Sequence, residues 1–249
     1  MSELHLLGTG GYHPSDTRHT ACFMLPEDGV ILDAGTSFFR VRDRIATSSI
    51  NIFLTHVHLD HCQGLTYIND VLRGKGIERI TVHGKQTHLN AVGEKLFDQY
   101  LFPVPFEHEL RPIAQETTVG DWTIRWMLQP DHPGTSLAYR FDGPATSFAY
   151  VSDTNADPDN EEKVAFVRGV KLMLHECYFT DGFEEAATTT GHSCSSAVGA
   201  FARNAGIDHL LLIHPSPVVG QDILTTIERQ VSAFVPDTRY ANDLEVVEF

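Results

Sequence analysis

The sequence predicts an α/β fold in which short apolar strands alternate with helices. Apolar residues make up 42% of the 249 residues, which is enough for a sizeable core. Short apolar runs recur along the chain, and the segments between them carry helical spacing or turn residues. Several of these runs end in His or Asp, so one edge of a layered sheet structure would collect them. No linker or repeat divides the chain, and we therefore expect one domain over residues 1–249.

The first half of the chain alternates strands with helices. Strands are expected at residues 4–7, 21–25, 30–33, 50–54 and 80–83, and as a pair around a turn within 117–127. Helices are expected at residues 37–45, 63–73 and 85–100. In the second half, strands are expected at 137–141, 148–154, 170–174 and 210–214, and a helix at 195–204.

The densest polar motif follows the apolar strand at residues 50–54. Four metal-ligand types occupy six positions, namely His56, His58, Asp60 and His61. Residues two apart on an extended segment face the same side, so His56 and His58 can hold one ion. If the chain then turns into a helix, the other two point elsewhere and can hold a second ion. A single His is usually a surface or core residue, but this density after a buried strand favours a metal site.

Three later residues can complete the ligand set. His132 lies in a loop between two expected strands, and His214 ends the apolar run at 210–213. Asp153 ends another apolar strand. A strand-end Asp is often a cap or turn residue, but a shared carboxylate is what a binuclear site needs to hold its ions about 3.5–4 Å apart. We therefore predict that Asp153 bridges the two ions.

The motif of His56, His58, Asp60 and His61 resembles the His-x-His-x-Asp-His signature of the metallo-β-lactamase superfamily. The resemblance implies a four-layer αββα sandwich of the metallo-β-lactamase type and a binuclear site. A strand-end Asp before Gly is common in that superfamily. Asp33 has this position, and we expect it to orient a ligand His from behind.

The second half is similar to the ribonuclease Z branch of the superfamily. The similarity rests on His175-Glu176-x-x-Phe179, on Gly191-His192-Ser193 and on the terminal strand that ends in His. The opening Leu7-Gly8-Thr9-Gly10 with Arg18 is similar as well. The resemblance implies that Glu176 and His192 work as a pair near the leaving group. The alternative for His192 is a residue that merely packs at a helix start.

One feature departs from ribonuclease Z. That family carries a long arm that grips tRNA, inserted between the counterparts of His132 and Asp153. Here those residues are only 21 positions apart. The chain also has 18 basic against 33 acidic residues and a net charge of −15, which disfavours extended nucleic-acid binding. Both observations favour armless relatives that cleave small or cyclic phosphodiesters, or RNA ends.

The expected chemistry is metal-assisted hydrolysis. A water between the ions would lose a proton near neutral pH and attack phosphorus, with Asp60 positioning it. His192, oriented by Glu176, would protonate the leaving alkoxide. The main alternative is a lactonase or thioesterase on the same scaffold. A mononuclear iron oxygenase and a non-catalytic protein are disfavoured because no ligand is missing.

Two divalent metal ions are the expected cofactors, most simply Zn²⁺, although Mn²⁺ or Fe also accept these ligands. No apolar run reaches about 18 residues, so no membrane span is expected. The N-terminus lacks the pattern of a signal peptide, and the four scattered cysteines are typical of buried thiols. These features favour a cytoplasmic protein that acts on a small anionic substrate. A homodimer is implied only by the resemblance.

Overall fold

The structure, a computed structural model, describes residues 2–249, which divide into two compact units. The N-terminal unit comprises residues 2–120 and 242–248, and the C-terminal unit comprises residues 121–241 with Phe249. No helix within residues 2–249 is long and apolar enough to cross a membrane. The expectation of a single domain over 1–249 stays a prediction.

The N-terminal unit is built on a seven-stranded mixed sheet with the order β14-β1-β2-β3-β4-β5-β6. Neighbouring strands are antiparallel from β14 to β3 and parallel from β3 to β6. The strands are β1 (Glu3–Gly8), β2 (Cys22–Leu25), β3 (Val30–Leu32), β4 (Ser49–Phe53), β5 (Arg79–Gly84), β6 (Glu109–Pro112) and β14 (Glu245–Glu248). The helical segments are η1 (Pro26–Asp28), η2 (Thr36–Arg44), α1 (Leu59–Cys62), η3 (Gln63–Tyr67), α2 (Ile68–Val71), α3 (Gln86–Ala91) and η4 (Val92–Leu96).

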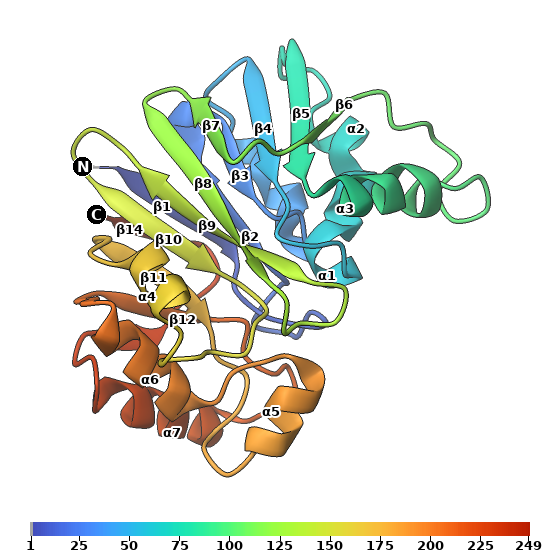
Figure 1. The fold of residues 1–249 in the computed structure, drawn as a ribbon. Coiled ribbons are helices and arrows are strands. Elements are labelled where there is room, and N and C mark those ends of the chain that lie inside the picture. The colour runs from blue at the N-terminus through green and yellow to red at the C-terminus, as the bar shows by residue number, and fades with distance from the viewer. Residues whose placement is uncertain (1) are drawn as a thin grey trace. The chain divides into compact units, whose positions relative to one another are not determined.

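Alternation along the central strands decides where the core of this unit lies. Ile50 and Ile52 of β4 and Val82 of β5 point to one face, where they pack with apolar residues of η2, η3, α2 and α3. The opposite face of the same strands carries polar residues such as Asn51 and His83. The helices therefore cover one face of the sheet, as Figure 1 shows for α2 and α3 beside β4 and β5.

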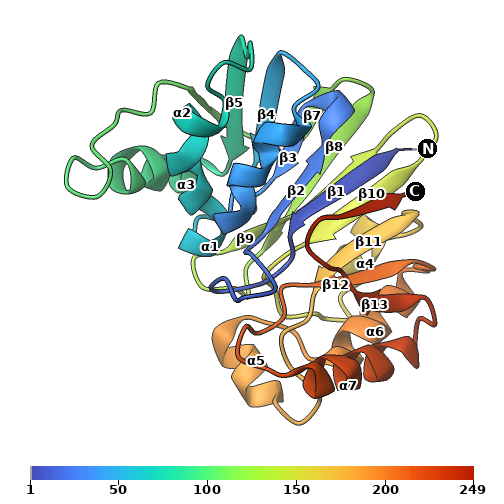
Figure 2. The same cartoon turned by 180° about the vertical axis from the view of Figure 1, so that it is seen from behind.

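The second sheet is also mixed, with the order β13-β12-β11-β10-β9-β8-β7. Its strands are β7 (Glu116–Val119), β8 (Trp122–Gln129), β9 (Ser136–Asp142), β10 (Ser147–Val151), β11 (Leu172–Glu176), β12 (Leu210–Ile213) and β13 (Thr238–Tyr240). The helices of the C-terminal unit are α4 (Glu161–Val167), α5 (Glu184–Thr190), α6 (Ser195–Asn204) and α7 (Gln221–Ser232). Apolar residues of α4, α6 and α7 pack on one face of β10, β11 and β12, and Figure 2 shows α6 and α7 side by side there.

The topology of this sheet explains how distant residues share one edge. β10, β11 and β12 are parallel, so their carboxyl ends meet at the same edge. β9 runs antiparallel to β10, and its amino end therefore lies at that edge too. His132 precedes β9, Asp153 follows β10, Glu176 ends β11 and His214 follows β12. The predicted convergence of strand ends is thus found within this unit.

The predicted α/β class is confirmed, with local differences in the helices. The helix expected at 85–100 ends at Leu96, because the Asp98 side chain accepts a hydrogen bond from the Tyr100 N–H and forms a turn instead. The helix expected at 63–73 is two short pieces, η3 and α2. The helix expected at 37–45 is the 3₁₀ segment η2. Helices α4, α5 and α7 and strands β13 and β14 were not predicted.

Candidate metal centre

The candidate ligands of the N-terminal unit lie in one segment, residues 56–61, shortly after β4. His58 is extended (φ −62°, ψ 150°) and caps α1, so the predicted turn into a helix occurs within the motif. The Nε2 atom of His56 lies 3.1 Å from the Nδ1 atom of His58, with the rings at 81° to each other. Two ring nitrogens therefore converge on one point. This is the arrangement predicted for residues two apart on an extended segment.

Asp33 contacts this segment and its candidate ligand His61 through hydrogen bonds, which agrees with the orienting role expected for it. Its fully buried carboxylate accepts hydrogen bonds from the backbone N–H of Thr55 at 2.7 Å and from the Thr55 hydroxyl at 2.9 Å. It also lies 2.8 Å from Nδ1 of His61. A proton on Nδ1 satisfies this contact and leaves Nε2 of His61 as the candidate ligand atom. Partners of this kind fix the ring orientation and tautomer of metal-binding histidines.

Asp60 has a buried environment of its own. One carboxylate oxygen lies 3.3 Å from Nε2 of His61 and accepts the backbone N–H of Tyr12 at 2.8 Å. Tyr12 belongs to the glycine-rich loop after β1. That loop thus holds Asp60 by its backbone, which the sequence did not reveal because a backbone donor carries no residue-type signal.

Backbone strain gathers around these residues. Among residues 2–249, five non-glycine residues have positive φ. Four of them belong to the candidate site or contact its residues: Tyr12, Asp33, Thr135 and His214, with φ between 54° and 67°. L-residues adopt this conformation at a cost of about 1–3 kcal/mol each, and such residues concentrate at functional sites. The surrounding hydrogen bonds, such as that from Thr135 N–H to the His132 carbonyl, maintain it.

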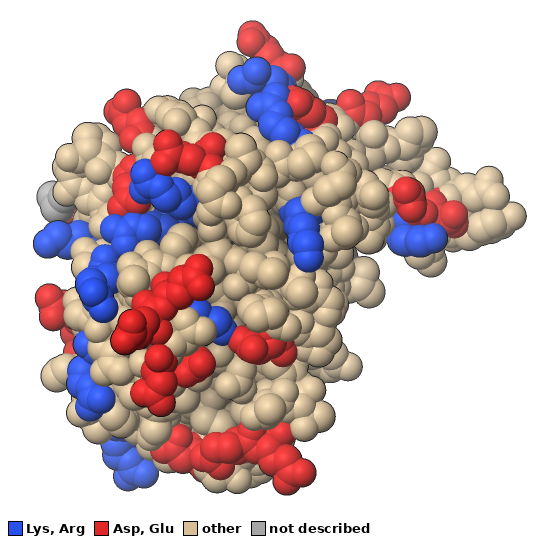
Figure 3. All heavy atoms as spheres, viewed as in Figure 1, with Lys and Arg blue, Asp and Glu red and all other residues tan. Residues whose placement is uncertain are grey.

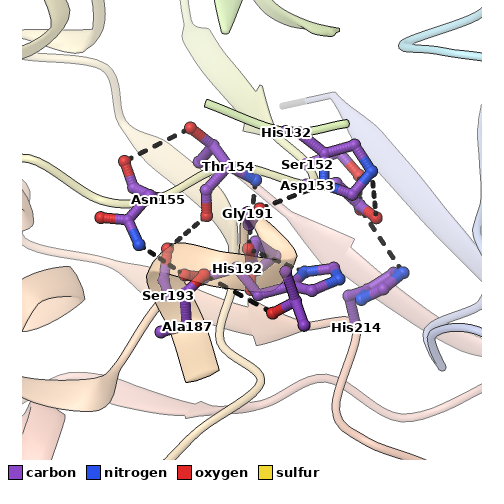
Figure 4. A network of polar contacts seen from close by, with 12 residues as sticks. His132, Ser152, Asp153, Thr154, Asn155, Ala187, Gly191, His192, Ser193 and His214 are labelled. Atoms are coloured by element: carbon purple, nitrogen blue, oxygen red, sulfur yellow. Dashed lines mark hydrogen bonds and ion pairs between the residues drawn. The ribbon is translucent and has the colours of Figure 1, made fainter. Parts of the chain in front are cut away.

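In the C-terminal unit, Asp153 lies between two histidines. One carboxylate oxygen is 3.6 Å from Nε2 of His132, and the other is 3.4 Å from Nε2 of His214. All three residues are buried. Figure 4 shows both rings directed at the carboxylate. A carboxylate with each oxygen facing a different histidine has the geometry that a ligand shared by two ions would need.

His132 is held in this orientation by a glycine. Its Nδ1 atom lies 3.1 Å from the carbonyl oxygen of Gly191, which ends α5 with φ 72°. A Cβ atom at Gly191 would come within 2.6 Å of the His132 Cα atom. The site thus requires glycine here both for its backbone conformation and for this close approach.

The predicted pair of Glu176 and His192 is formed within the same unit. Glu176 is fully buried, and its Oε1 atom lies 3.2 Å from Nδ1 of His192. The same oxygen accepts the backbone N–H of Thr154, next to Asp153, at 3.1 Å. Tyr178 stacks on the His192 ring at 4.8 Å and 20°. His192 is therefore fixed by a carboxylate and an aromatic ring, which is more than packing at a helix start requires.

Further bonds hold the backbone around His192, as Figure 4 shows. Asn155 donates from its amide to the His192 carbonyl at 2.9 Å. Ser193 donates its hydroxyl to the Thr154 carbonyl at 2.8 Å and accepts the Ala156 N–H at 2.9 Å. Sequence analysis gave no role to Thr154 or Asn155. The one sequence feature that could have identified them is that they directly follow Asp153 at the end of the same strand.

The donor set fits divalent metal ions. The two units supply imidazole nitrogens and carboxylate oxygens, the donors that zinc and its first-row neighbours accept. In three of the histidines the nitrogen opposite the candidate ligand atom contacts an oxygen: His56 with Thr55, His61 with Asp33 and His132 with Gly191. This pattern is typical of metal-binding histidines. The four cysteines are free thiols, all buried, and none belongs to the donor set.

Comparison with known proteins places the chain in a family. The family described as "Beta-lactamase superfamily domain" matches residues 29–215, a span that includes every candidate ligand. The chain therefore belongs to the β-lactamase superfamily, as its His-x-His-x-Asp-His motif predicted. This agrees with the α/β architecture, and the expected metallo-β-lactamase type of fold is confirmed.

Within that family, the chain is similar to ribonuclease Z. Ribonuclease Z of Streptomyces avermitilis is 23% identical over 298 residues, covering 98% of this chain and 96% of that relative. The aligned length exceeds the 249 residues of this chain, so the relative carries segments that have no counterpart here.

Solved structures share the fold. The metallo-β-lactamase fold protein YhfI of Bacillus subtilis has a TM-score of 0.78 at 20% identity, with 99% of each chain covered. Unliganded yeast PDE1 also has a TM-score of 0.78, at 15% identity, with 100% of each chain covered. At these identities the likeness establishes the fold, and substrate must be argued from the site.

Proposed function

We propose that this protein is a binuclear metallohydrolase that cleaves phosphodiester bonds in small or cyclic phosphodiesters, or at RNA ends. The observation that carries the proposal is the Glu176–His192 pair in the same unit as the Asp153 ligand set. A ligand set alone suits many hydrolyses, whereas an oriented histidine adds a proton donor for a poor leaving group such as an alkoxide. The similarity to ribonuclease Z supports the same reaction class.

We assign the ligands in two groups. His56, His58 and His132 hold one ion, Asp60, His61 and His214 hold the other, and Asp153 belongs to both. The β-lactamase superfamily match spans all seven residues, which supports treating them as one set. Zinc fits these donors best, and manganese or iron would also accept them.

The protein side chains carry the remaining chemistry. When bound, divalent ions at these ligands would neutralise phosphate oxygens and lower the pKa of a bound water. Asp60, held by the Tyr12 N–H, is placed to orient the attacking water. In its doubly protonated form, His192 would direct one proton, on Nδ1, at Glu176 and transfer the other, from Nε2, to the departing oxygen, leaving a neutral ring.

Two features support a small substrate. The chain is shorter than its alignment with ribonuclease Z, and the segment between His132 and Asp153 is the plain hairpin of β9 and β10. On the face shown in Figure 3, Lys and Arg side chains lie in separate groups among Asp and Glu. Such a surface does not favour a long phosphate backbone, whose binding relies on many basic contacts.

The test is hydrolysis of two phosphodiesters by metal-loaded protein: bis(p-nitrophenyl) phosphate, whose leaving group needs no proton, and a 2′,3′-cyclic nucleotide, whose leaving group is an alkoxide. On the cyclic nucleotide the His192→Ala variant should lose ~10²–10⁴-fold in kcat, the usual size of a general-acid contribution, whereas on bis(p-nitrophenyl) phosphate the loss should be small. His209→Ala, a partly buried histidine just before β12 in the same unit, serves as the matched control and should retain activity.

A lactone and a thioester panel accompanies this assay. If one of these esters is cleaved and the phosphodiester is not, the phosphodiesterase proposal is wrong. Full turnover of the cyclic nucleotide in His192→Ala would remove the proposed role of the Glu176–His192 pair.

A further inference from the structure

We propose that Asp243 is a positioning residue, which fixes the candidate ligand Asp60 through the glycine-rich loop at residues 9–19. The inference rests on the proposed function and adds to it a residue to which sequence analysis gave no role. All of these residues belong to the N-terminal unit. Figure 2 shows the segment before β14, in red, passing the end of β1, where the loop begins.

The Asp243 carboxylate holds both ends of this loop. Its Oδ1 atom accepts hydrogen bonds from the backbone N–H and the hydroxyl of Thr9, both at 2.9 Å, where the loop begins. Its Oδ2 atom accepts the backbone N–H of His19 at 2.8 Å, where the loop ends. The side chain of Asp243 is only 7% exposed, so water competes little for these bonds. One carboxylate therefore fixes the two loop ends relative to each other.

A guanidinium group compensates the charge of this buried carboxylate. Arg40 of η2 donates to Oδ2 of Asp243 at 2.6 Å, and the same Arg40 nitrogen donates to the carbonyl oxygen of Leu7 in β1. A buried carboxylate without such a partner would be costly, because it would lose its hydration and gain no opposite charge. The ion pair therefore fixes Asp243 relative to β1 and η2, and the loop ends with it.

The backbone next to Asp243 is strained. Leu244 has φ 65° and is the fifth of the non-glycine residues with positive φ among residues 2–249, the one that lies outside the candidate site. Its side chain is 52% exposed, so packing does not account for this conformation. Its N–H donates to the Leu6 carbonyl oxygen at 2.7 Å, at the turn into β14. Strain of this kind concentrates at functional sites, and here it lies beside the carboxylate that holds the loop.

The loop in turn reaches Asp60 through its backbone. The N–H of Tyr12 donates to Oδ2 of Asp60 at 2.8 Å. The side chain of Tyr12 is 72% exposed, so few packing contacts hold this part of the loop. A segment with few buried contacts opens locally at low cost unless its ends are fixed. The bonds of Asp243 therefore keep the Tyr12 N–H directed at Asp60.

Attachment of β14 to the sheet does not account for these bonds. β14 pairs with β1 in a register that runs from Glu3 with Glu248 to Leu6 with Glu245. Backbone hydrogen bonds thus secure the strand without the Asp243 side chain. The carboxylate instead accepts its hydrogen bonds from the loop and from η2.

Amide hydrogen exchange of the full chain tests the role of Asp243 directly. Asp243→Asn removes the charge and replaces one acceptor oxygen with an amide nitrogen that cannot accept. The Tyr12 amide should exchange ~10-fold faster in this variant. The Leu54 amide, which donates to the His83 carbonyl oxygen within the sheet, should exchange as in wild-type protein. Titration with a chromophoric chelator should show ~10-fold weaker binding of the ion that we assign to Asp60.

Kinetics with bis(p-nitrophenyl) phosphate measure the consequence for the reaction. Its leaving group needs no proton, so the rate reports on Asp60 and not on His192. Asp243→Asn should lower kcat ~10-fold, because a small displacement of Asp60 misplaces the attacking water. KM should stay near the wild-type value, because the substitution does not change the groups that bind the substrate.

A second pair of variants leaves Asp243 intact, in case Asp243→Asn does not fold. Thr9→Val removes the hydroxyl that donates to Asp243, and Thr9→Ser keeps it. We expect faster Tyr12 exchange and a lower kcat in the valine variant, and wild-type values in the serine variant. The matched control is Asp98→Asn, because the Asp98 carboxylate also accepts a backbone N–H in the same unit. It should change neither quantity.

The outcomes separate this inference from the proposed function. Unchanged exchange of the Tyr12 amide would overturn the inference, and so would equally faster exchange of all amides, because Asp243 would then only stabilise the fold. Faster Tyr12 exchange with wild-type metal affinity and kcat would overturn it as well, because the loop would not act on Asp60. If wild-type protein hydrolyses no phosphodiester, the proposed function fails, and the exchange and the titration still decide the role of Asp243.

Discussion

The two units supply their candidate ligands in opposite ways. In the N-terminal unit four ligands lie within six residues, and a strand followed by one helical turn sets their directions. In the C-terminal unit His132, Asp153 and His214 span 83 positions and meet only because strand ends share one edge of a sheet. The first set is encoded locally and the second by topology.

The difference extends to the groups that support the ligands. Asp33 holds the first set through a side chain, and its contacts to Thr55 and His61 can be removed by one substitution. In the second set the Gly191 carbonyl holds His132, and no side-chain replacement removes a carbonyl. The local set is therefore the easier one to weaken selectively.

The largest expected effect concerns the residue that we assign to both ions. Asp153→Asn should reduce phosphodiester hydrolysis to background and lower the metal content by up to two ions per chain, because the replacement removes the negative charge shared by both ligand groups. His58→Ala and His214→Ala should each lower the content by about one ion. Metal content measured by atomic emission after dialysis, with circular dichroism to confirm folding, tests this ranking. Equal losses in all three variants would contradict a bridging role for Asp153.

The second effect concerns the orientation of the proton donor. Glu176→Gln keeps the volume of the side chain but removes the charge facing Nδ1 of His192. We expect a ~10²-fold loss in kcat for substrates with an alkoxide leaving group. For a p-nitrophenolate leaving group, which needs no proton, the loss should be small. Equal losses on the two substrates would indicate that Glu176 only stabilises the fold.

The sequence was sufficient to nominate the candidate ligands, which stay a prediction. Each candidate ligand is a residue type with a restricted set of roles, and each follows an apolar strand. A contact of Asp33 with a candidate ligand histidine was expected from the superfamily resemblance, and the structure places it at His61. Backbone donors such as the Tyr12 and Thr154 N–H groups were not expected, because every residue type possesses them.

The fold was predicted less completely at its edges. Strand β14 pairs with β1 across most of the chain length, and four residues at an edge have no local pattern that reveals such a partner. Helix α7 was also missed, although its buried residues Leu224, Ile227 and Val231 have helical spacing. That signal was present in the sequence. The second sheet depended on pairings that only tertiary contacts decide.

The third effect concerns Asp33, the side chain that supports the candidate ligands of the N-terminal unit. Asp33→Asn should weaken metal affinity by ~10–100-fold, the usual cost of losing an outer partner of a ligand histidine. The ion that depends on His61 should be lost first. Titration with a chromophoric chelator resolves the two binding steps. If the affinity falls equally in both binding steps, Asp33 does not support the ion at His61 selectively, and the locally encoded set is not independent of the other.

The smallest effect concerns a buried histidine outside the ligand sets. His83 is 1% exposed, stacks on Phe53 at 4.5 Å, and contacts the Asn51 amide oxygen at 3.1 Å. Burial, and then the nearby Arg111, lower the pKa of His83 to about 4, while Glu109 acts in the opposite direction. His175 of the C-terminal unit is also buried, and its pKa is lowered by the same cause.

A lowered histidine pKa makes the unfolded chain bind more protons than the folded one between about pH 4 and 6.5. The free energy of unfolding therefore falls as the pH drops through this range, by ~1.4 kcal/mol per pH unit for His83 at most. At pH 5 the titration of His83 lowers the free energy of unfolding by ~2 kcal/mol relative to neutral pH. Thermal midpoints of metal-free protein at pH 7.5 and pH 5 measure it, with His83→Gln as the variant. The difference between the two midpoints should shrink in His83→Gln. An unchanged difference would show that His83 does not cause the acid sensitivity, and would point to His175 of the C-terminal unit instead.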